Sequence, residues 1–327
     1  MPELRYVDAL NRAHHEEMER DERVVVLGED VGRKGGVFGV TQGLYERFGE
    51  ERVLDTPLAE SSIVGCAIGM ACNGLVPIAE IQFADFIHPA FDQIVSEAAR
   101  MRYRSNGNYG VPMVIRVPYG GAHGTALYHS QCIEAFYAHV PGLKVVAPST
   151  PYDAKGMLKA AVRDPDPVLF LEHKRMYRLV RGEVPEGDYT VPLGPAVVRR
   201  EGRDLSLFSY GWTLHEALAA AQTAAQEGIE VEVVDVRCLR PLDKETLLRS
   251  VAKTNKALIV YEDNRFGGFG AELAALIAEE AFEDLDGPVM RLAGPDVPGI
   301  PFAKPLEQWF WINQEKILEA VRRLAHY

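Results

Sequence analysis

Short apolar runs rich in β-branched residues alternate with helical segments along most of this chain. Runs of this length suit strands that are buried on both faces, and strand–helix alternation predicts a parallel sheet covered by helices. The strands expected in the N-terminal part are 24–28, 77–81, 113–117, 143–147 and 168–171. The helices expected there are 6–20, 62–74, 86–104, 130–139 and 151–163. The pattern predicts an α/β fold.

A polar segment rich in glycine and proline interrupts this pattern between residues 178 and 202, and a second alternation follows it. The strands expected there are 205–210, 230–236, 257–262 and 288–292, and the helices are 214–227, 243–253, 269–283 and 313–325. A chain of 327 residues has room for two domains. We predict a first domain at 1–185, a linker at 186–202 and a smaller α/β domain at 203–327.

Charge and apolar content exclude several classes of function. The net charge is −12 and no basic run occurs, which argues against binding to nucleic acid or to an anionic membrane. The most apolar stretch, 63–79, is broken by glycines, an asparagine and a proline, and the N-terminus lacks a signal-peptide pattern. The four cysteines show no CxxC spacing, as expected for reduced thiols. A cytoplasmic protein is predicted.

Glu60 is a lone carboxylate just ahead of an apolar helix that contains Gly65 and Gly69. No basic residue lies in this segment, and burying an unpaired carboxylate is costly. Glu60 alone is explained as well by a favourable interaction with the helix dipole. The two glycines share one helix face, which suits either tight packing within the chain or contact with a partner subunit.

Polar and aromatic residues crowd the end of the strand expected at 77–81, where ligands bind in open α/β sheets. Gln82 offers hydrogen bonds and Phe86 a flat ring, although Phe86 also suits the core and Asp85 a helix cap. The strand at 113–117 is followed by a glycine-rich loop with His123 and His129. Placed just before a helix, His129 is expected to stay neutral and able to transfer protons. His123 is an equal candidate on local grounds, and both histidines also suit solvated surface.

Glu60 and the two glycines match the pattern E-x4-G-Φ-x-x-G-Φ of thiamine-diphosphate enzymes, in which Φ is apolar. The chain as a whole resembles the β subunit of the E1 component of 2-oxo acid dehydrogenase complexes. The matching segments are 27–31, 56–60, 82–86, 90–94, 127–131, 141–146, 172–178 and 240–243. Segments 80–86, 127–131 and 173–178 are most similar to the branched-chain type. The resemblance implies a transketolase-like pyrimidine domain and a smaller domain like the transketolase C-terminal domain.

The resemblance also implies a role for each matching residue. Glu60 would hydrogen-bond the aminopyrimidine ring of thiamine diphosphate, and Glu29 would lie close to Glu60 and help relay its proton. His129 would bind substrate and protonate the lipoyl sulfur during acyl transfer. The remaining residues implied to line the cofactor pocket are Leu58, Ala59, Gln82 and Phe86. Those implied to lie at the substrate are Phe83 and Asp85.

The other half of a thiamine-diphosphate site is missing from the sequence. The family holds Mg²⁺ with a Gly-Asp-Gly motif, which this chain lacks, and we predict no metal ligand here. The resemblance therefore implies an E1 α subunit that holds Mg²⁺, an α2β2 heterotetramer and an E2 acyltransferase partner. Some relatives bind K⁺ near the equivalent of loop 163–166, but Val114 stands where a threonine would help.

The sequence is also compatible with two other functions. A pyruvate or acetoin dehydrogenase β subunit would carry much the same motifs, and pocket residues around 83–86 would distinguish it. A non-catalytic scaffold that only docks E1 α and E2 would not need Glu60, Gln82, Phe86 and His129 together. A free-standing thiamine enzyme would need the Mg²⁺ motif that is absent here.

Overall fold

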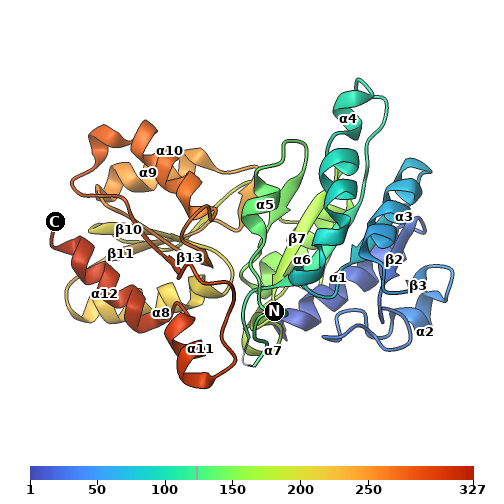
Figure 1. Cartoon of the computed structure of the whole chain (residues 1–327), viewed down its shortest axis with the longest axis horizontal. Helices are drawn as coiled ribbons and strands as arrows, with labels where there is room; N and C mark the ends of the chain where they lie inside the picture. Colours follow the sequence, from blue (N-terminus) through green and yellow to red (C-terminus); the bar gives the residue numbers. More distant parts are fainter. Residues whose placement is uncertain (123) are drawn as a thin grey trace. The chain divides into compact units, whose positions relative to one another are not determined.

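The computed structural model describes residues 1–122 and 124–327, so His123 lies outside the described residues. The chain forms two compact units (Figure 1). The first comprises Met1–Tyr119 and Phe136–Leu193, and the second comprises Gly120–Ala135 and Gly194–Tyr327. The second unit thus includes a loop from the middle of the sequence. The domain limits 1–185, 186–202 and 203–327 stay a prediction.

The first unit is built on a parallel sheet whose strands are almost entirely buried. Its strand order is β6 (Lys144–Val146), β7 (Val168–His173), β5 (Val114–Tyr119), β4 (Val76–Glu80), β2 (Val24–Gly28) and β3 (Val53–Asp55). All strands expected from the apolar runs are present. Strand β3 was not expected, because three residues are too few to show a pattern. Strands β1 (Glu3–Arg5) and β8 (Arg181–Glu183) form a separate antiparallel pair.

In the first unit, three helices begin within two residues of their expected positions, the helix expected at 130 begins four residues later, and the short helices 44–48 and 176–179 were not expected. The helices of this unit are α1 (Tyr6–Arg20), α2 (Leu44–Phe48), α3 (Glu60–Cys72), α4 (Met101–Arg104), α5 (Glu134–Ala138), α6 (Pro151–Val162) and α7 (Met176–Leu179). The single helix expected at 86–104 is wrong. In its place are short 3-10 turns at Ala84–Phe86 and His88–Ala90, a π-helix at Gln93–Ala98, and α4. Pro89 lacks an amide donor, which does not suit a regular helix interior.

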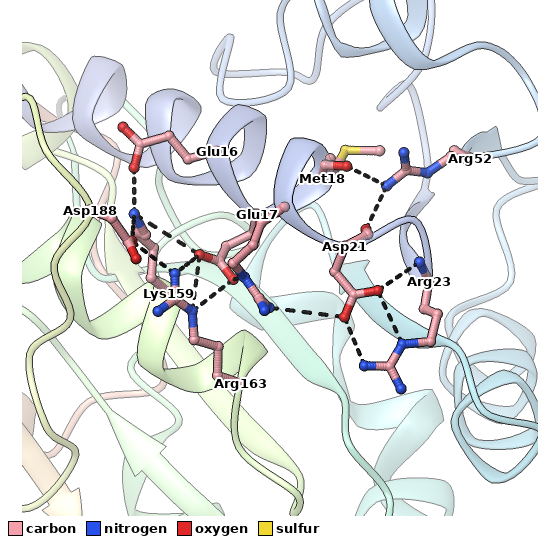
Figure 2. Close-up of polar contacts among 10 residues, drawn as sticks. Glu16, Glu17, Met18, Asp21, Arg23, Arg52, Lys159, Arg163 and Asp188 are labelled. Carbon is pink, nitrogen blue, oxygen red and sulfur yellow. Dashed lines mark hydrogen bonds and ion pairs between the residues drawn. The ribbon is translucent and has the colours of Figure 1, made fainter.

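An ion-pair network joins α1 to α6 and reaches into the predicted linker (Figure 2). Glu17 of α1 accepts hydrogen bonds from Arg163, the residue that caps the C-terminus of α6, with an Nη2–Oε1 distance of 2.6 Å. Arg163 also pairs with Asp188 at 2.8 Å, and Lys159 pairs with both Asp188 and Glu16. Lys159 and Arg163 lower the pKa of Asp188 to about 2. The first part of the predicted linker is therefore anchored to the first unit.

The second unit contains a sheet in the order β14 (Met290–Gly294), β13 (Ala257–Asn264), β10 (Leu205–Ser209), β11 (Val231–Asp235) and β9 (Val197–Arg200). Helices α8 (Trp212–Gln226) and α12 (Gln314–Ala325) cover one face, and α9 (Lys244–Thr254) and α10 (Gly270–Glu280) cover the other (Figure 1). A further strand, β12 (Cys238–Arg240), and helix α11 (Lys304–Phe310) complete the regular elements.

Strand β9 lies within the segment that the sequence assigned to the linker. It pairs antiparallel with β11 at the edge of the sheet, and its four residues are only partly buried. Its two apolar residues followed by two arginines give no alternating pattern, which explains why it was missed. In the described residues, no helix is long and apolar enough to cross a membrane.

Candidate functional site

The strand order of the first unit reverses beside β2. Strand β3 pairs with one side of β2 and β4 with the other, although the chain visits them in the order β2, β3, β4. Gly28 is level with Asp55 on β3 and with Glu80 on β4, so these three strands end at the same edge of the sheet. A crevice at such a reversal is where open α/β sheets bind ligands. The residues that follow these strands are therefore the candidates for a site.

Two carboxylates meet at this edge. Glu60 is the first residue of α3 rather than a residue ahead of it, and only 8% of it is exposed. Glu29 follows β2 and is partly buried. Burial and the nearby charge of Glu60 raise the pKa of Glu29, with smaller effects from Asp30 and Glu80. In the described part of the chain, no group donates a hydrogen bond to the Glu60 carboxylate. Two acidic side chains thus lie near this edge, and burial together with the nearby charge favours the protonated form of Glu29.

Gln82 links the end of β4 to the segment after β2. Its amide nitrogen lies 3.4 Å from the Glu29 carbonyl oxygen and 3.4 Å from Asp30 Oδ2, where it donates long hydrogen bonds. The structure therefore places Gln82 beside the segment that carries Glu29, and the cofactor roles of Glu29, Glu60 and Gln82 stay a prediction. The sequence does not show that Gln82 and Glu29 lie close together, because their contact depends on the register of β2 and β4.

The aromatic residues beyond β4 form a chain of ring contacts. Phe83 makes edge contacts with Phe86 and Phe38, at centroid distances of 5.8 and 5.5 Å. Phe38 in turn stacks on Tyr177 at 4.9 Å. Asp85 and Phe86 lie in the 3-10 turn Ala84–Phe86 and are partly buried. These contacts hold the rings of Phe83 and Phe86 just beyond the carboxyl end of β4.

Leu58 and Ala59 lead into α3. Ala59 is the N-cap residue of this helix, and no side chain caps it. Leu58 is 77% exposed. An added Cβ at Gly69 would meet nothing within 4 Å, and one at Gly65 would touch only Gln93 Cγ at 3.9 Å. Tight packing inside the described chain therefore does not explain the two glycines.

Sequence reasoning missed a buried ion cluster beneath this edge. Arg116 of β5 is fully buried and donates hydrogen bonds to both oxygens of Glu172 on β7, at 2.7 and 2.5 Å. It also donates to Glu80 at 2.5 Å, and the Tyr177 hydroxyl donates to Glu172 at 2.6 Å. The signal was a charged residue inside each of three apolar strands. Because Tyr177 stacks on Phe38, the cluster also supports the aromatic chain.

His129 belongs to the second unit, in the loop Gly120–Ala135, and is partly buried. The helix expected to begin beside it begins only at Glu134, so the argument that a helix terminus keeps His129 neutral is wrong. The other candidate, His123, lies outside the described residues. The loop is closed by hydrogen bonds from Gly120 to Gln131 O at 3.0 Å and between the hydroxyls of Thr125 and Ser130 at 2.5 Å.

A group of acidic residues lies at the end of this loop. Burial, with a smaller contribution from Asp263, raises the pKa of Glu134 to about 8, and burial raises the pKa of Asp263 to about 6. Glu134 Oε1 accepts a hydrogen bond from the Tyr210 hydroxyl at 2.9 Å. Among the described residues, Glu134 Oε2 has no partner. Burial therefore favours the protonated form of Glu134 in the folded chain.

Glu134→Gln should flatten the pH dependence of stability. Because folding raises the pKa of Glu134 from 4.5 to about 8, its stabilising effect is complete below the lower value and is lost as pH rises through the upper one. The wild-type free energy of unfolding should thus fall more between about pH 5 and pH 9 than that of the variant. Urea unfolding of the full chain at both pH values measures this. Equal slopes for Glu134→Gln and wild type would contradict the assignment.

No described group of three or more histidine, cysteine, aspartate or glutamate side chains has metal-binding geometry. In the loop suggested for K⁺, Lys144 Nζ lies 2.6 Å from both oxygens of Asp164, and Arg102 pairs with Asp166. Arg102 also donates to the Pro165 carbonyl at 3.2 Å. The carboxylates of this loop thus have cationic partners from the chain itself, and the K⁺ site stays a prediction.

Comparison with known proteins agrees with this architecture. The profile of the transketolase pyrimidine binding domain matches residues 3–180, and that of the transketolase C-terminal domain matches residues 194–317. The 2-oxoisovalerate dehydrogenase subunit beta of Bacillus subtilis (strain 168) is 58% identical over 327 residues, which is 100% of each chain. This chain belongs to the E1 β subunits of 2-oxo acid dehydrogenases. The predicted family and its α/β fold are confirmed.

Two further relatives share a smaller part of their residues with this chain. The pyruvate dehydrogenase E1 component subunit beta of Bacillus subtilis (strain 168) is 46% identical over 100% of each chain. The 2-oxoisovalerate dehydrogenase subunit beta 2, mitochondrial, of Arabidopsis thaliana is 49% identical over 98% of this chain and 88% of its own. A solved chain described as split gene transketolase, inactive beta4 tetramer, has a TM-score of 0.79 at 24% identity, covering 99% of this chain and 98% of that one. That likeness concerns the fold.

Proposed function

We propose that this chain is the β subunit of a thiamine-diphosphate-dependent branched-chain 2-oxo acid dehydrogenase. The observation that carries the proposal is the pair of neighbouring acids Glu29 and Glu60 at the reversal of the sheet. The higher identity to the 2-oxoisovalerate enzyme (58%) than to the pyruvate enzyme of the same organism (46%) supports the branched-chain type. The overall reaction is oxidative decarboxylation of a 2-oxo acid with reductive acylation of a lipoyl group on E2, in which the lipoyl disulfide is the oxidant.

The residues at the sheet edge fit an aminopyrimidine ring. Glu60 is nearly buried and accepts no hydrogen bond from the described chain, so its carboxyl group can bond a ring nitrogen of a ligand. Gln82 and Phe86 supply a hydrogen-bonding amide and an aromatic surface beside it, and Leu58 and Ala59 border the same edge. Thiamine diphosphate, when bound, supplies the nucleophilic carbon and the electron sink for decarboxylation.

In this proposal Glu60 holds the proton that passes to and from the aminopyrimidine ring. Glu29 acts as its reservoir, because burial and the charge of Glu60 favour its protonated form. Phe83 and Asp85 bound the space for the 2-oxo acid side chain. His129 contacts the substrate and supplies the proton for acyl transfer. In that transfer the lipoyl disulfide would be the oxidant: one sulfur would receive the acyl group as it leaves the cofactor, and the other, released as the S–S bond breaks, would take the proton that His129 supplies.

The assembly we propose is an α2β2 heterotetramer that works with an E2 dihydrolipoyl acyltransferase in the cytoplasm. The α subunit would hold Mg²⁺ and the diphosphate, since this chain lacks a Gly-Asp-Gly motif. The open space at Gly65 and Gly69 and the exposed Leu58 suit contact with that subunit. The alternative of a scaffold without catalysis is less favourable, because it gives no reason for two adjacent acids at a buried sheet edge.

The assembled enzyme should prefer 3-methyl-2-oxobutanoate to pyruvate. Two additional methyl groups on the substrate would fill an apolar pocket, and each is worth only about 1–3 kcal/mol, so the preference in kcat/KM should be about 10-fold or more. Steady-state kinetics with co-expressed α and β chains measure it. A clear preference for pyruvate would contradict the branched-chain assignment and favour the pyruvate or acetoin type.

A further inference from the structure

The loop that carries His129 is fastened to the second unit by buried carboxylates. The amide of Gly121 donates a hydrogen bond to Glu262 on β13, and the amide of Gly124 donates to Glu307 Oε1 on α11 at 2.9 Å. Glu262 is 9% exposed and Glu307 is 2% exposed. Hydrogen bonds from neutral amides to carboxylates are stronger than those between neutral groups, and more so away from water.

Packing around the loop leaves no room for a side chain at Gly121 or at Gly299. A Cβ added to Gly121 would lie 2.7 Å from Ile300 Cδ1 and 3.1 Å from Trp311 Nε1. A Cβ added to Gly299 would lie 2.1 Å from Leu127 Cδ1. The segment that contains Gly299 and Ile300 therefore packs closely against Gly121 and Leu127 of the loop.

The other end of the loop is held separately. The Tyr210 hydroxyl, just after β10, donates to Glu134 at 2.9 Å. His129 therefore lies between two attachment points of the loop, Gly124 bound to Glu307 and Glu134 bound to Tyr210. Between them, the hydroxyls of Thr125 and Ser130 bond each other at 2.5 Å. All of these residues belong to the second unit.

We propose that Glu307 and Tyr210 are positioning residues that hold the His129 loop in place for acyl transfer to lipoate. The inference rests on the proposed function of His129. A proton donor must lie within hydrogen-bond distance of the sulfur it protonates, and a displacement of about 1 Å can lower a rate by about 100-fold. The C-terminal unit thus contributes to catalysis through the loop, in addition to any part in assembly.

The test compares two half-reactions of the α2β2 enzyme with thiamine diphosphate and Mg²⁺. Decarboxylation is followed with an artificial electron acceptor, and acylation with the lipoylated domain of E2. Glu307→Leu removes the acceptor for the Gly124 amide, and Tyr210→Phe removes the donor to Glu134. Acylation should fall by about 10-fold or more in Glu307→Leu and less in Tyr210→Phe, and in both it should fall more than decarboxylation. Glu307→Gln keeps an acceptor oxygen and should restore most of the acylation rate.

Two further variants make the outcomes decisive. Glu283→Gln changes an exposed carboxylate of the same unit and should behave as wild type. His129→Ala should lose acylation; an unchanged rate would overturn the role of His129 and the positioning proposal together. If His129→Ala is impaired while Glu307→Leu and Tyr210→Phe acylate normally, only the positioning proposal is overturned. If Glu307→Leu does not assemble, the other two variants decide. A normal acylation rate in Tyr210→Phe overturns the positioning proposal. A loss of acylation in Glu307→Gln as large as that in His129→Ala also overturns it.

Discussion

Glu60→Gln is expected to abolish most decarboxylation while leaving the α2β2 enzyme assembled. Glutamine has nearly the same size and can still accept a hydrogen bond, but it cannot take up and release a proton. Acid–base catalysis by a positioned side chain contributes about 100- to 10,000-fold, so the loss in kcat should lie in this range. Turnover with an artificial electron acceptor measures the rate, and size-exclusion chromatography measures assembly.

A matched control separates this effect from a general influence of the helix terminus. Glu245 also lies in the first turn of a helix, α9, but its side chain is 89% exposed. Glu245→Gln should therefore leave turnover near the wild-type value. Wild-type turnover in Glu60→Gln would refute the catalytic role and favour the scaffold reading.

Arg116→Met is expected to cause the largest loss of stability among single substitutions at this site. It would leave Glu80 and Glu172 buried without their guanidinium partner, with only the Tyr177 hydroxyl bonded to Glu172. Breaking a buried ion pair from one side costs about 3–5 kcal/mol. Burial already raises the pKa of Glu80 despite Arg116, so loss of the cation should raise it further. The destabilisation should thus shrink as pH falls and Glu80 takes up a proton.

Urea unfolding of the full chain at neutral and acidic pH measures both parts of this expectation. Adding Glu80→Gln and Glu172→Gln to Arg116→Met should recover much of the lost stability, because no buried charge remains. Arg203→Met, at an arginine whose side chain is 79% exposed, should change stability by less than about 0.5 kcal/mol. A loss in Arg116→Met that is independent of pH would point to packing rather than charge.

Local sequence predicted the elements of the fold well where a run of residues carries its own pattern. Strands such as β2 and β4 appear as apolar runs. Helix α6 begins at Pro151, as the predicted range 151–163 has it, and Thr150 accepts a hydrogen bond from the Asp153 amide. Elements without such a pattern were missed or misjudged. The three-residue strand β3, the edge strand β9 and the irregular turns of 84–98 depend on neighbours for their shape.

The candidate site divides in the same way. Some parts of the site are visible in the sequence, because each depends on residues next to it. They are Glu60 at the start of an apolar helix, Gln82 and Phe86 after a buried strand, and the glycine-rich loop with His129. Only the tertiary structure brings Glu29 beside Glu60, since strand register determines that distance. It alone reveals the Glu80–Arg116–Glu172 cluster and the attachment of the His129 loop to Glu307, because these contacts join residues far apart in the chain. Sequence alone determined the family and predicted its half-site, because each motif lies in contiguous residues. The raised pKa of Glu29 and the attachment of the His129 loop depend on packing and burial, which only the tertiary structure shows.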